Sequence, residues 1–312
     1  MAMTETEPGG AADDTDLARE FEAHRPRLLR LAYATTGSLA EAEDCVQEAW
    51  LRLQRSPDRA VIRNLTGWLT TTVSRLALDA LGSARMRRER YTGPWLPEPL
   101  VEDMATDPAA NPADRVTLDE SVSMALLVVL ERLSPAERTA FLLHDVFGMA
   151  FDEVADVVGR SPAAVRQLAA RARRHVQDDR PRFPPTRGQQ QELLDAFLSA
   201  CAEGDLERLL SLLDPDVVWR ADGGGKVTAA PSLARGAPRI AQVLLGYARQ
   251  GPFQMRMALV NGAPGLIVRD FGGVLSVIAL TIDAGRITAF DVIRDPDKLA
   301  GISLPPEDQR ER

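Results

Sequence analysis

Cysteine and histidine are scarce in this sequence, and their scarcity excludes several classes of site. The 312 residues contain two cysteines, Cys45 and Cys201, and three histidines. Two thiols far apart on predicted helices form neither a disulfide framework nor a metal cluster, so we expect buried free thiols and no metal site. The glycine run at 223–225 lacks the spacing of a phosphate-binding loop. We expect the chain to use no cofactor.

Long apolar runs are also absent. No segment approaches the length of a membrane span, and the N-terminal residues are small and acidic, unlike those of a signal peptide. We therefore expect a cytoplasmic protein with no membrane association. The formal net charge of −8 argues against non-specific coating of DNA, but it does not exclude DNA binding through local basic patches.

Basic charge is concentrated between Arg160 and Val176, a segment with five arginines, one histidine and no acidic residue. Ser161 is a suitable N-cap for a helix, and Pro162 fits the first helical position. A predicted short helix at 151–158 and a turn at Gly159 precede it, which is helix-turn-helix spacing. Such a helix fits the major groove of DNA, whereas solvated surface arginines are the alternative. The expected DNA contacts are Arg160, Ser161, Arg166, Gln167, Arg171 and Arg174.

Apolar periodicity predicts that most of the first 178 residues are helical. Capping boxes at 38–41 and 134–137 mark two helix starts, and another helix begins near Leu65. A long helix is expected at about 114–133, and the helix opened at Ser134 should end near Gly148. Residues 1–15 are expected to be disordered, and Tyr91 to Pro112 reads as a proline-rich linker. A second basic stretch from Arg75 to Tyr91 suggests contact with a second DNA segment.

The pattern changes after Gln189. Helices are predicted at 189–203, 205–213 and 237–249, and strands at 217–221, 254–260, 265–270, 274–282 and 286–293. Helices followed by a meander of strands favour an α+β domain with a curved antiparallel sheet.

Three segments of the helical part resemble conserved regions of bacterial sigma factors. Ala42 to Leu53 (AEDCVQEAWLRL) resembles region 2.2, and Leu65 to Leu81 (LTGWLTTTVSRLALDAL) resembles regions 2.3 and 2.4. Leu133 to Val176 resembles region 4. Two such regions without an intervening region 3 are the layout of the extracytoplasmic-function (ECF) class, and this resemblance implies two all-α domains.

The resemblance also implies roles for individual residues. Asp44, Gln47, Glu48 and Trp50 would contact the polymerase clamp, and the helix-turn-helix residues named above would read the −35 element. The −10 element would be held by Arg63, Asn64, Trp68, Arg75, Arg85, Arg87 and Arg88. The alternatives are a solvated helix face for the first set, a plain connection for the loop around Asn64 and a core position for Trp68.

The C-terminal part resembles a SnoaL-like domain, a cone-shaped α+β fold. Three motifs sharpen the resemblance to one ECF group: WLPEP at 95–99, DGGGK at 222–226 and NGAPG at 261–265. The family resemblance implies regulation in cis, with the extension replacing a separate anti-sigma protein. The residues expected to make these regulatory contacts are Trp95, Glu98, Asp222, Lys226 and Asn261. A contact of Trp95 or Glu98 with the DGGGK loop is our hypothesis, and an ordinary loop beside a solvated linker is the alternative.

Catalysis by this extension is not expected. All three histidines lie outside it, and its isolated carboxylates Asp216, Asp222, Asp270 and Asp291 are weak evidence for acid–base chemistry. The mostly apolar strand at 275–280 leaves open a small apolar ligand as a signal, against a filled core used for protein contacts.

The sequence thus predicts an alternative sigma factor that binds the clamp and flap of core RNA polymerase and directs promoter-specific initiation. The rival interpretation is a ligand-responsive DNA-binding regulator that does not engage polymerase, and an enzyme with a nucleic-acid-targeting module is a third. The predicted divisions are a tail at 1–15, region 2 at 16–92, a linker at 93–113, region 4 at 114–178, a linker at 179–188, the SnoaL-like domain at 189–300 and a tail at 301–312.

Overall fold

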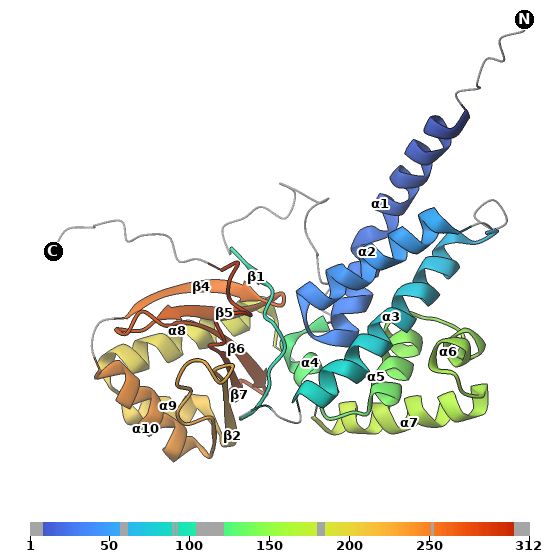
Figure 1. Cartoon of the computed structure of the whole chain (residues 1–312). Coiled ribbons are helices and arrows are strands. Elements are labelled where there is room, and N and C mark those ends of the chain that lie inside the picture. The colour runs from blue at the N-terminus through green and yellow to red at the C-terminus, as the bar shows by residue number, and fades with distance from the viewer. Residues whose placement is uncertain are drawn as a thin grey trace, which may run out of the picture. The chain divides into compact units, whose positions relative to one another are not determined.

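The computed structural model describes residues 9–56, 62–88, 91, 93–103, 122–179, 185–250 and 253–302 (Figure 1). The chain divides into two compact units. Unit 1 comprises Met1–Gly82, Asn111–Thr117 and Pro135–Ala169, and unit 2 comprises Ser83–Ala110, Leu118–Ser134 and Ala170–Arg312. These divisions differ from the predicted ones, because residues of the predicted linker and the start of the predicted region 4 belong to the same unit as the C-terminal domain.

Helices build unit 1. Their bounds are α1 (Gly9–Thr36), α2 (Leu39–Arg55), α3 (Leu65–Arg88), α5 (Pro135–Phe141), the π-helical turn η3 (Leu142–Val146), α6 (Phe151–Val158) and α7 (Pro162–Asp179). The last turns of α3 and the second half of α7 belong to unit 2. Ser38 caps α2 as predicted, because its side chain accepts a hydrogen bond from the Glu41 amide.

Two helix boundaries differ from the prediction. Residues 9–15 were expected to be disordered, but they extend α1, which is consistent with the strong helix preference of Ala11 and Ala12 and with the low cost of lengthening a formed helix. The helix expected at 114–133 begins at Met124 as α4 (Met124–Leu130), because the Ser123 side chain caps it. Residues 104–121 lie outside the described part of the chain.

A seven-stranded sheet is the centre of unit 2, in the order β1-β4-β5-β6-β7-β2-β3. Its strands are β1 (Val101–Glu102), β2 (Leu213–Asp222), β3 (Leu233–Arg235), β4 (Gln254–Val260), β5 (Ala263–Arg269), β6 (Leu275–Asp283) and β7 (Arg286–Ile293). The helices of this part are α8 (Arg187–Glu203), α9 (Leu206–Leu212) and α10 (Ala237–Ala248).

The sheet is mixed, which corrects the expected all-antiparallel arrangement. Strands β2 and β7 pair in parallel, because the long connection through α10 and β4–β6 lets the chain return beside β2 in the same direction. A second difference is β1, which comes from the predicted linker. Val101 pairs with Val260 and Glu102 with Leu259, so the linker contributes an edge strand to the C-terminal sheet.

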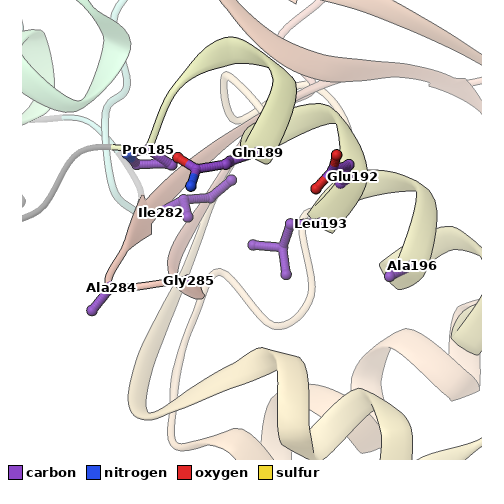
Figure 2. Close-up of a pocket in the computed structure, with 8 residues that line it drawn as sticks. All are labelled: Pro185, Gln189, Glu192, Leu193, Ala196, Ile282, Ala284 and Gly285. Carbon is purple, nitrogen blue, oxygen red and sulfur yellow. The ribbon is translucent and has the colours of Figure 1, made fainter.

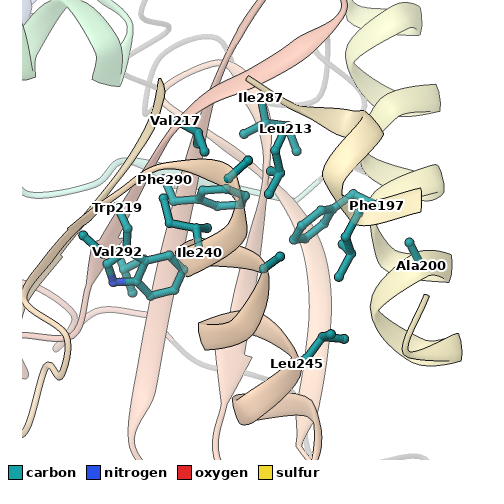
Figure 3. Packing of buried hydrophobic residues seen from close by; sticks show 14 of the residues in the cluster. Phe197, Ala200, Leu213, Val217, Trp219, Ile240, Leu245, Ile287, Phe290 and Val292 are labelled. Carbon is teal, nitrogen blue, oxygen red and sulfur yellow. The ribbon is translucent and has the colours of Figure 1, made fainter. Parts of the chain in front are cut away.

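The two faces of the sheet carry separate cores, since successive side chains of a strand point to opposite sides. On one face, Phe197, Trp219 and Phe290 pack with apolar residues of α8, α9 and α10 (Figure 3). The ring centroid of Phe290 lies 5.5 Å from that of Phe197 and 5.7 Å from that of Trp219. Side chains therefore fill the inside of the curved sheet.

The opposite face of the sheet is covered by the linker and α4. Leu96 of the linker and Met124 of α4 are buried against Ala258, Ile267 and Val277 of three neighbouring strands. Within β6, Val277 belongs to this second core and Ile278 packs against the first. The linker and α4 are therefore integral parts of the α+β unit.

Both cysteines are free thiols, as predicted, with Cys45 buried and Cys201 half-buried. Burial raises the pKa of Cys201 to about 12. Burial, followed by the charges of Glu41 and Asp44, raises the pKa of Cys45 to about 11. Both side chains therefore stay protonated and weakly nucleophilic near neutral pH.

The first core predicts the effect of truncating Phe290. Phe290→Ala removes a ring that is 1% exposed, so it should destabilise the protein by about 3–5 kcal/mol. Denaturant unfolding followed by circular dichroism measures this loss. Phe271→Ala is the matched control, because Phe271 is 66% exposed and its loss should cost roughly 0.5 kcal/mol or less. Equal unfolding midpoints for the two variants would contradict this account of the core.

Candidate functional site

The predicted helix-turn-helix is present. Gly159 ends α6 in the left-handed conformation with φ of 67°, and the Ser161 hydroxyl accepts a hydrogen bond from the Ala164 amide at 3.3 Å. Val165 and Leu168 are buried on the inner side of α7. The candidate DNA-binding side chains of this motif are exposed: Arg160, Ser161, Arg166, Gln167, Arg171 and Arg174.

The predicted −10 residues cluster at two parts of α3. Arg63 and Asn64 are exposed just before the helix, and Trp68 is half-buried in its first turn. The Asn64 side chain accepts a hydrogen bond from the Gly67 amide at 2.9 Å, so it caps α3. Residues 57–61 of the preceding loop lie outside the described part of the chain. At the other end, Arg85, Arg87 and Arg88 lie in α3, and their side chains are also outside that part.

Arg75 is engaged inside unit 1. Its Nη2 donates a hydrogen bond at 2.9 Å to the backbone oxygen of Asp156 in α6. A residue expected to face the −10 element therefore contacts the helix that precedes the recognition helix.

Arg138 makes a second connection of this kind, and sequence reasoning missed it. Its side chain is almost fully buried, and Nε and Nη2 donate to the Ala34 oxygen of α1 at 3.2 and 3.0 Å. The end of α1 is a favourable place for a cation, because the helix dipole leaves negative charge there. Helix α5, from the predicted region 4, is therefore joined to α1, from the predicted region 2. In the sequence, Arg138 is marked only by being the one arginine within the apolar pattern of residues 135–143.

The predicted polymerase-binding residues lie on α2. Asp44 and Gln47 are exposed, and Glu48 forms an ion pair with Arg52 at 2.8 Å. The Trp50 ring packs on Phe21 of α1, with centroids 4.8 Å apart. A groove of about 380 Å³ runs along the two helices, and it is lined by Ala18, Phe21, Glu22, Arg25, Glu43, Val46, Gln47 and Trp50.

The carboxylate of Asp222 is fully buried and accepts four hydrogen bonds. The Tyr91 hydroxyl donates to its carboxylate, as do the Leu96 amide at 2.8 Å, the Gly224 amide at 3.0 Å and Lys298 Nζ at 2.7 Å. We call Tyr91, Trp95, Leu96, Asp222 and Lys298 the Asp222 cluster. It joins the linker to the loop after β2 and to the segment after β7.

Lys298 completes the Asp222 cluster from the other side. Its Nζ donates to the Leu96 oxygen at 2.5 Å and lies 4.1 Å from the centre of the Trp95 ring, a cation–π distance. Burial, followed by the hydrogen bond to Asp222, raises the pKa of the Tyr91 hydroxyl well above its usual value. Tyr91 is therefore neutral and donates at physiological pH.

Residues of the motifs at 222–226 and 261–265 bind the linker. Asn261 makes two hydrogen bonds to Leu100. Its backbone N–H donates to the Leu100 carbonyl oxygen at 2.8 Å, and its side-chain Oδ1 accepts from the Leu100 backbone N–H at 3.1 Å. Lys226, expected to make a regulatory contact, is exposed and pairs with Asp297 instead. Lys298 is the lysine at the linker, and Glu98 is half-buried.

Two of the three glycines of the DGGGK loop, Gly223 and Gly224, are required by close packing. A Cβ on Gly223 would lie 2.2 Å from the Val227 oxygen, and one on Gly224 would lie 2.4 Å from Asp295 Cγ. Gly224 also has a φ of 68°, which other residues rarely adopt. The loop can therefore present its amide to Asp222 only with glycine at these positions.

Two pockets open on the surface of unit 2. One of about 560 Å³ lies between α8 and the β6–β7 turn, near Gln189, Leu193 and Ile282 (Figure 2). Another of about 680 Å³ includes Tyr247 and Phe271 among its lining residues. Strand β6, for which the sequence left open either a ligand site or a filled core, contributes its apolar side chains to the two packed cores.

The candidate carboxylates are mostly paired. Asp270 binds Arg294 at 2.5 Å, Asp291 binds Arg220 at 2.5 Å and Asp222 binds Lys298, while Asp216 is exposed. Among the described residues, no group of three or more histidine, cysteine, aspartate or glutamate side chains is placed to hold a metal ion. No helix of the described part is both long and apolar enough to cross a membrane.

Comparison with known proteins identifies the helical part. The family model for Sigma-70 region 2 matches residues 21–87, and that for Sigma-70, region 4 matches residues 123–176. The sequence is 44% identical over 305 residues to the ECF RNA polymerase sigma factor SigJ of Mycobacterium tuberculosis, covering 91% of this chain and 94% of that protein. It is 37% identical over 282 residues to a probable ECF RNA polymerase sigma factor, SigI, of the same organism, covering 89% and 93%.

The similarity extends to the structure of the whole chain. The crystal structure of the Mycobacterium tuberculosis ECF sigma factor SigJ matches with a TM-score of 0.74 and 41% identity, covering 92% of this chain and 100% of the other. The match therefore includes the α+β part as well as the two helical regions. These findings confirm the predicted fold class apart from the mixed sheet, and they exclude the rival class of regulators that do not engage polymerase. The chain belongs to the ECF family of RNA polymerase sigma factors.

Proposed function

We propose that this sigma factor directs promoter-specific transcription by core RNA polymerase and is regulated in cis by its own α+β domain, which holds the linker between regions 2 and 4. The observation that carries the regulatory part is the Asp222 cluster. A buried carboxylate accepts hydrogen bonds from the linker backbone and from Tyr91, and Lys298 neutralises it.

Three exposed surfaces support the initiation role: one on α2, one around the start of α3 and one on α7. Asp44 and Gln47 on α2 contact the polymerase clamp, and region 4 contacts the flap. Arg166 and Gln167 on α7 read base edges of the −35 element, and Arg174 contacts phosphates, which position the protein without specifying sequence. Arg63, Asn64 and the basic end of α3 hold the −10 element.

Promoter binding requires unit 1 to open. The −10 and −35 elements are about 25 base pairs apart, or roughly 85 Å along the duplex at about 3.4 Å per base pair. A compact unit of about 120 residues has a radius of gyration of roughly 14 Å. Regions 2 and 4 therefore cannot bind both elements while Arg138 holds Ala34 and Arg75 holds Asp156.

The α+β domain controls this opening through the linker. Leu96 and Met124 are buried in the second core, Val101 and Glu102 pair with β4, and Leu100 is bound twice by Asn261. The prolines of WLPEP restrict the free linker and lower the entropy cost of docking it. Since the chain carries this restraint itself, we infer that no separate anti-sigma protein is needed.

The α+β domain acts in this proposal through protein contacts. Its first core is filled by aromatic and aliphatic side chains, and Asp222, Asp270 and Asp291 are each paired with a basic residue. This supports a regulatory role without catalysis and without a ligand inside the curved sheet. The proposed place of action is the cytoplasm, where core polymerase and promoter DNA are found.

Weakening the Asp222 cluster should release the linker. Asp222→Asn leaves the buried Lys298 ammonium without its counter-charge, a change that costs about 3–5 kcal/mol at buried ion pairs. We expect faster hydrogen exchange of the backbone amides of residues 91–103. We also expect promoter-dependent run-off transcription with core polymerase to rise about fivefold or more above wild type, because a loss of 1.4 kcal/mol changes an equilibrium constant about tenfold. Asp216→Asn, an exposed carboxylate on the same strand, should change neither. Unaltered exchange in Asp222→Asn would overturn the role of the cluster.

Removing the buried arginine should open unit 1. Arg138→Met keeps the length of the side chain but deletes two charge-assisted hydrogen bonds, each worth about 1.5–3 kcal/mol. Small-angle X-ray scattering should show a larger radius of gyration for the free protein. Arg19→Met, at an exposed arginine of α1, serves as the control and should leave the scattering unchanged. Identical curves for Arg138→Met and wild type would show that this contact does not hold the unit closed.

A further inference from the structure

Three side chains from successive elements of region 4 form a stack. The imidazole of His144 in η3 lies on the ring of Phe151, with centroids 3.7 Å apart and the planes inclined by 26°. The Arg166 guanidinium carbon lies over the same Phe151 ring, 5.3 Å from its centre. The stack joins the start of the helix-turn-helix to the recognition helix α7.

The inner end of this stack is fixed by backbone contacts. His144 Nδ1 is 2.9 Å from the Met149 oxygen, and the Met149 amide donates to the Leu143 oxygen at 2.8 Å. The π-helical turn, which departs from regular helix geometry, carries His144 to this position. The imidazole is therefore held independently of Phe151.

Phe151 itself is held by the start of α6. It is the first residue of that helix, and the preceding amide, that of Ala150, donates to Glu153 Oε2 at 3.0 Å. Its ring is half-buried, with one face on His144. A rigid aromatic face is thus presented toward α7 at the level of Arg166.

An aromatic support suits Arg166. It is exposed, and a free arginine side chain loses considerable rotamer entropy when it binds a base edge. A planar guanidinium stacks well on an aromatic face and keeps its N–H donors directed outward in the ring plane. The ring would restrict the guanidinium before DNA arrives, without consuming its hydrogen-bond donors.

We propose that Phe151 is a positioning residue for promoter recognition: it holds the Arg166 guanidinium in the orientation that reads the −35 element. This inference rests on the proposed role of α7 in reading that element. Phe151 touches no base itself in this scheme, so its effect on sequence selectivity should pass entirely through Arg166. A purely structural phenylalanine would instead affect every base position alike.

The test measures base preference at each promoter position. Holoenzyme assembled with core RNA polymerase is incubated with duplex DNA of randomised upstream sequence, and the bound DNA is sequenced. Phe151→Ala, Phe151→Tyr, Arg166→Ala and the double variant Phe151→Ala/Arg166→Ala are compared with wild type. Phe147→Ala is the matched control, because Phe147 is also half-buried beside the helix-turn-helix but lies outside the stack.

We expect Arg166→Ala to flatten the preference at one or two −35 positions by about fivefold or more, the size of a lost bidentate base contact. Phe151→Ala should flatten the same positions, and the double variant should lose no more than Arg166→Ala alone. Phe151→Tyr, which keeps the aromatic face, should retain the wild-type pattern. The base preferences at the −10 positions should stay unchanged in all variants. Phe147→Ala should keep the wild-type preference at every position.

Other results would overturn the inference in distinguishable ways. A wild-type holoenzyme that selects no −35 sequence would reject the proposed role of α7 itself. A selective wild type with a Phe151→Ala variant that keeps its pattern, or loses preference equally at all positions, would reject the positioning role alone. So would a double variant whose loss is the sum of the two single losses, since additive effects mean independent residues.

Discussion

The buried charge of Asp222 is the constraint on which the arrangement of unit 2 depends. A carboxylate without water must have a counter-charge and hydrogen bonds, and here these come from four residues in three segments of the chain. Lys298 follows the last strand, Gly224 lies in the loop after β2, and Tyr91 and Leu96 belong to the linker. The linker is thus needed to satisfy a charge that the α+β domain has buried. An ion pair of this kind selects one docked arrangement more than it adds stability, because an apolar substitute could pack as well but would not require these donors.

The sheet also depends on the linker, and over a larger surface than the Asp222 cluster does. One face is closed by α8, α9 and α10, as in a self-contained α+β domain, but the other face is closed by Leu96 and by Met124 of α4. Region 4 therefore begins on the surface of the α+β domain and continues in unit 1, where Arg138 joins it to region 2. Under the proposed function, these contacts make promoter binding, linker release and opening of unit 1 linked equilibria.

Local sequence signals were sufficient for most of the elements. Capping residues located α2 and α7, and the apolar runs after Gln189 located β4 and β7 with the bounds observed. The parallel pairing of β2 with β7 was not predictable in this way, since it joins strands more than sixty residues apart. The strand β1 was missed because two residues in a proline-rich segment carry no periodicity. For the site, the motifs drew attention to Asp222 and Asn261, but not to Lys298, which lies 76 residues from Asp222 in the sequence and meets it only in the fold. Arg138 could not be recognised, because its role depends on a carbonyl oxygen that carries no residue-type signal.

The short strand β1 has a consequence for the lifetime of the open protein. It pairs with the last two residues of β4, Leu259 and Val260, and an uncovered edge presents backbone N–H and C=O groups that attract another strand. A linker that detaches from this edge therefore leaves unpaired backbone groups on β4, which can pair again with the linker or with a strand of a neighbouring chain. The released state persists only while a partner keeps the linker elsewhere. Under the proposed function, the fold thus ties the lifetime of the open form to occupancy by polymerase and limits the time during which a free, open copy could aggregate.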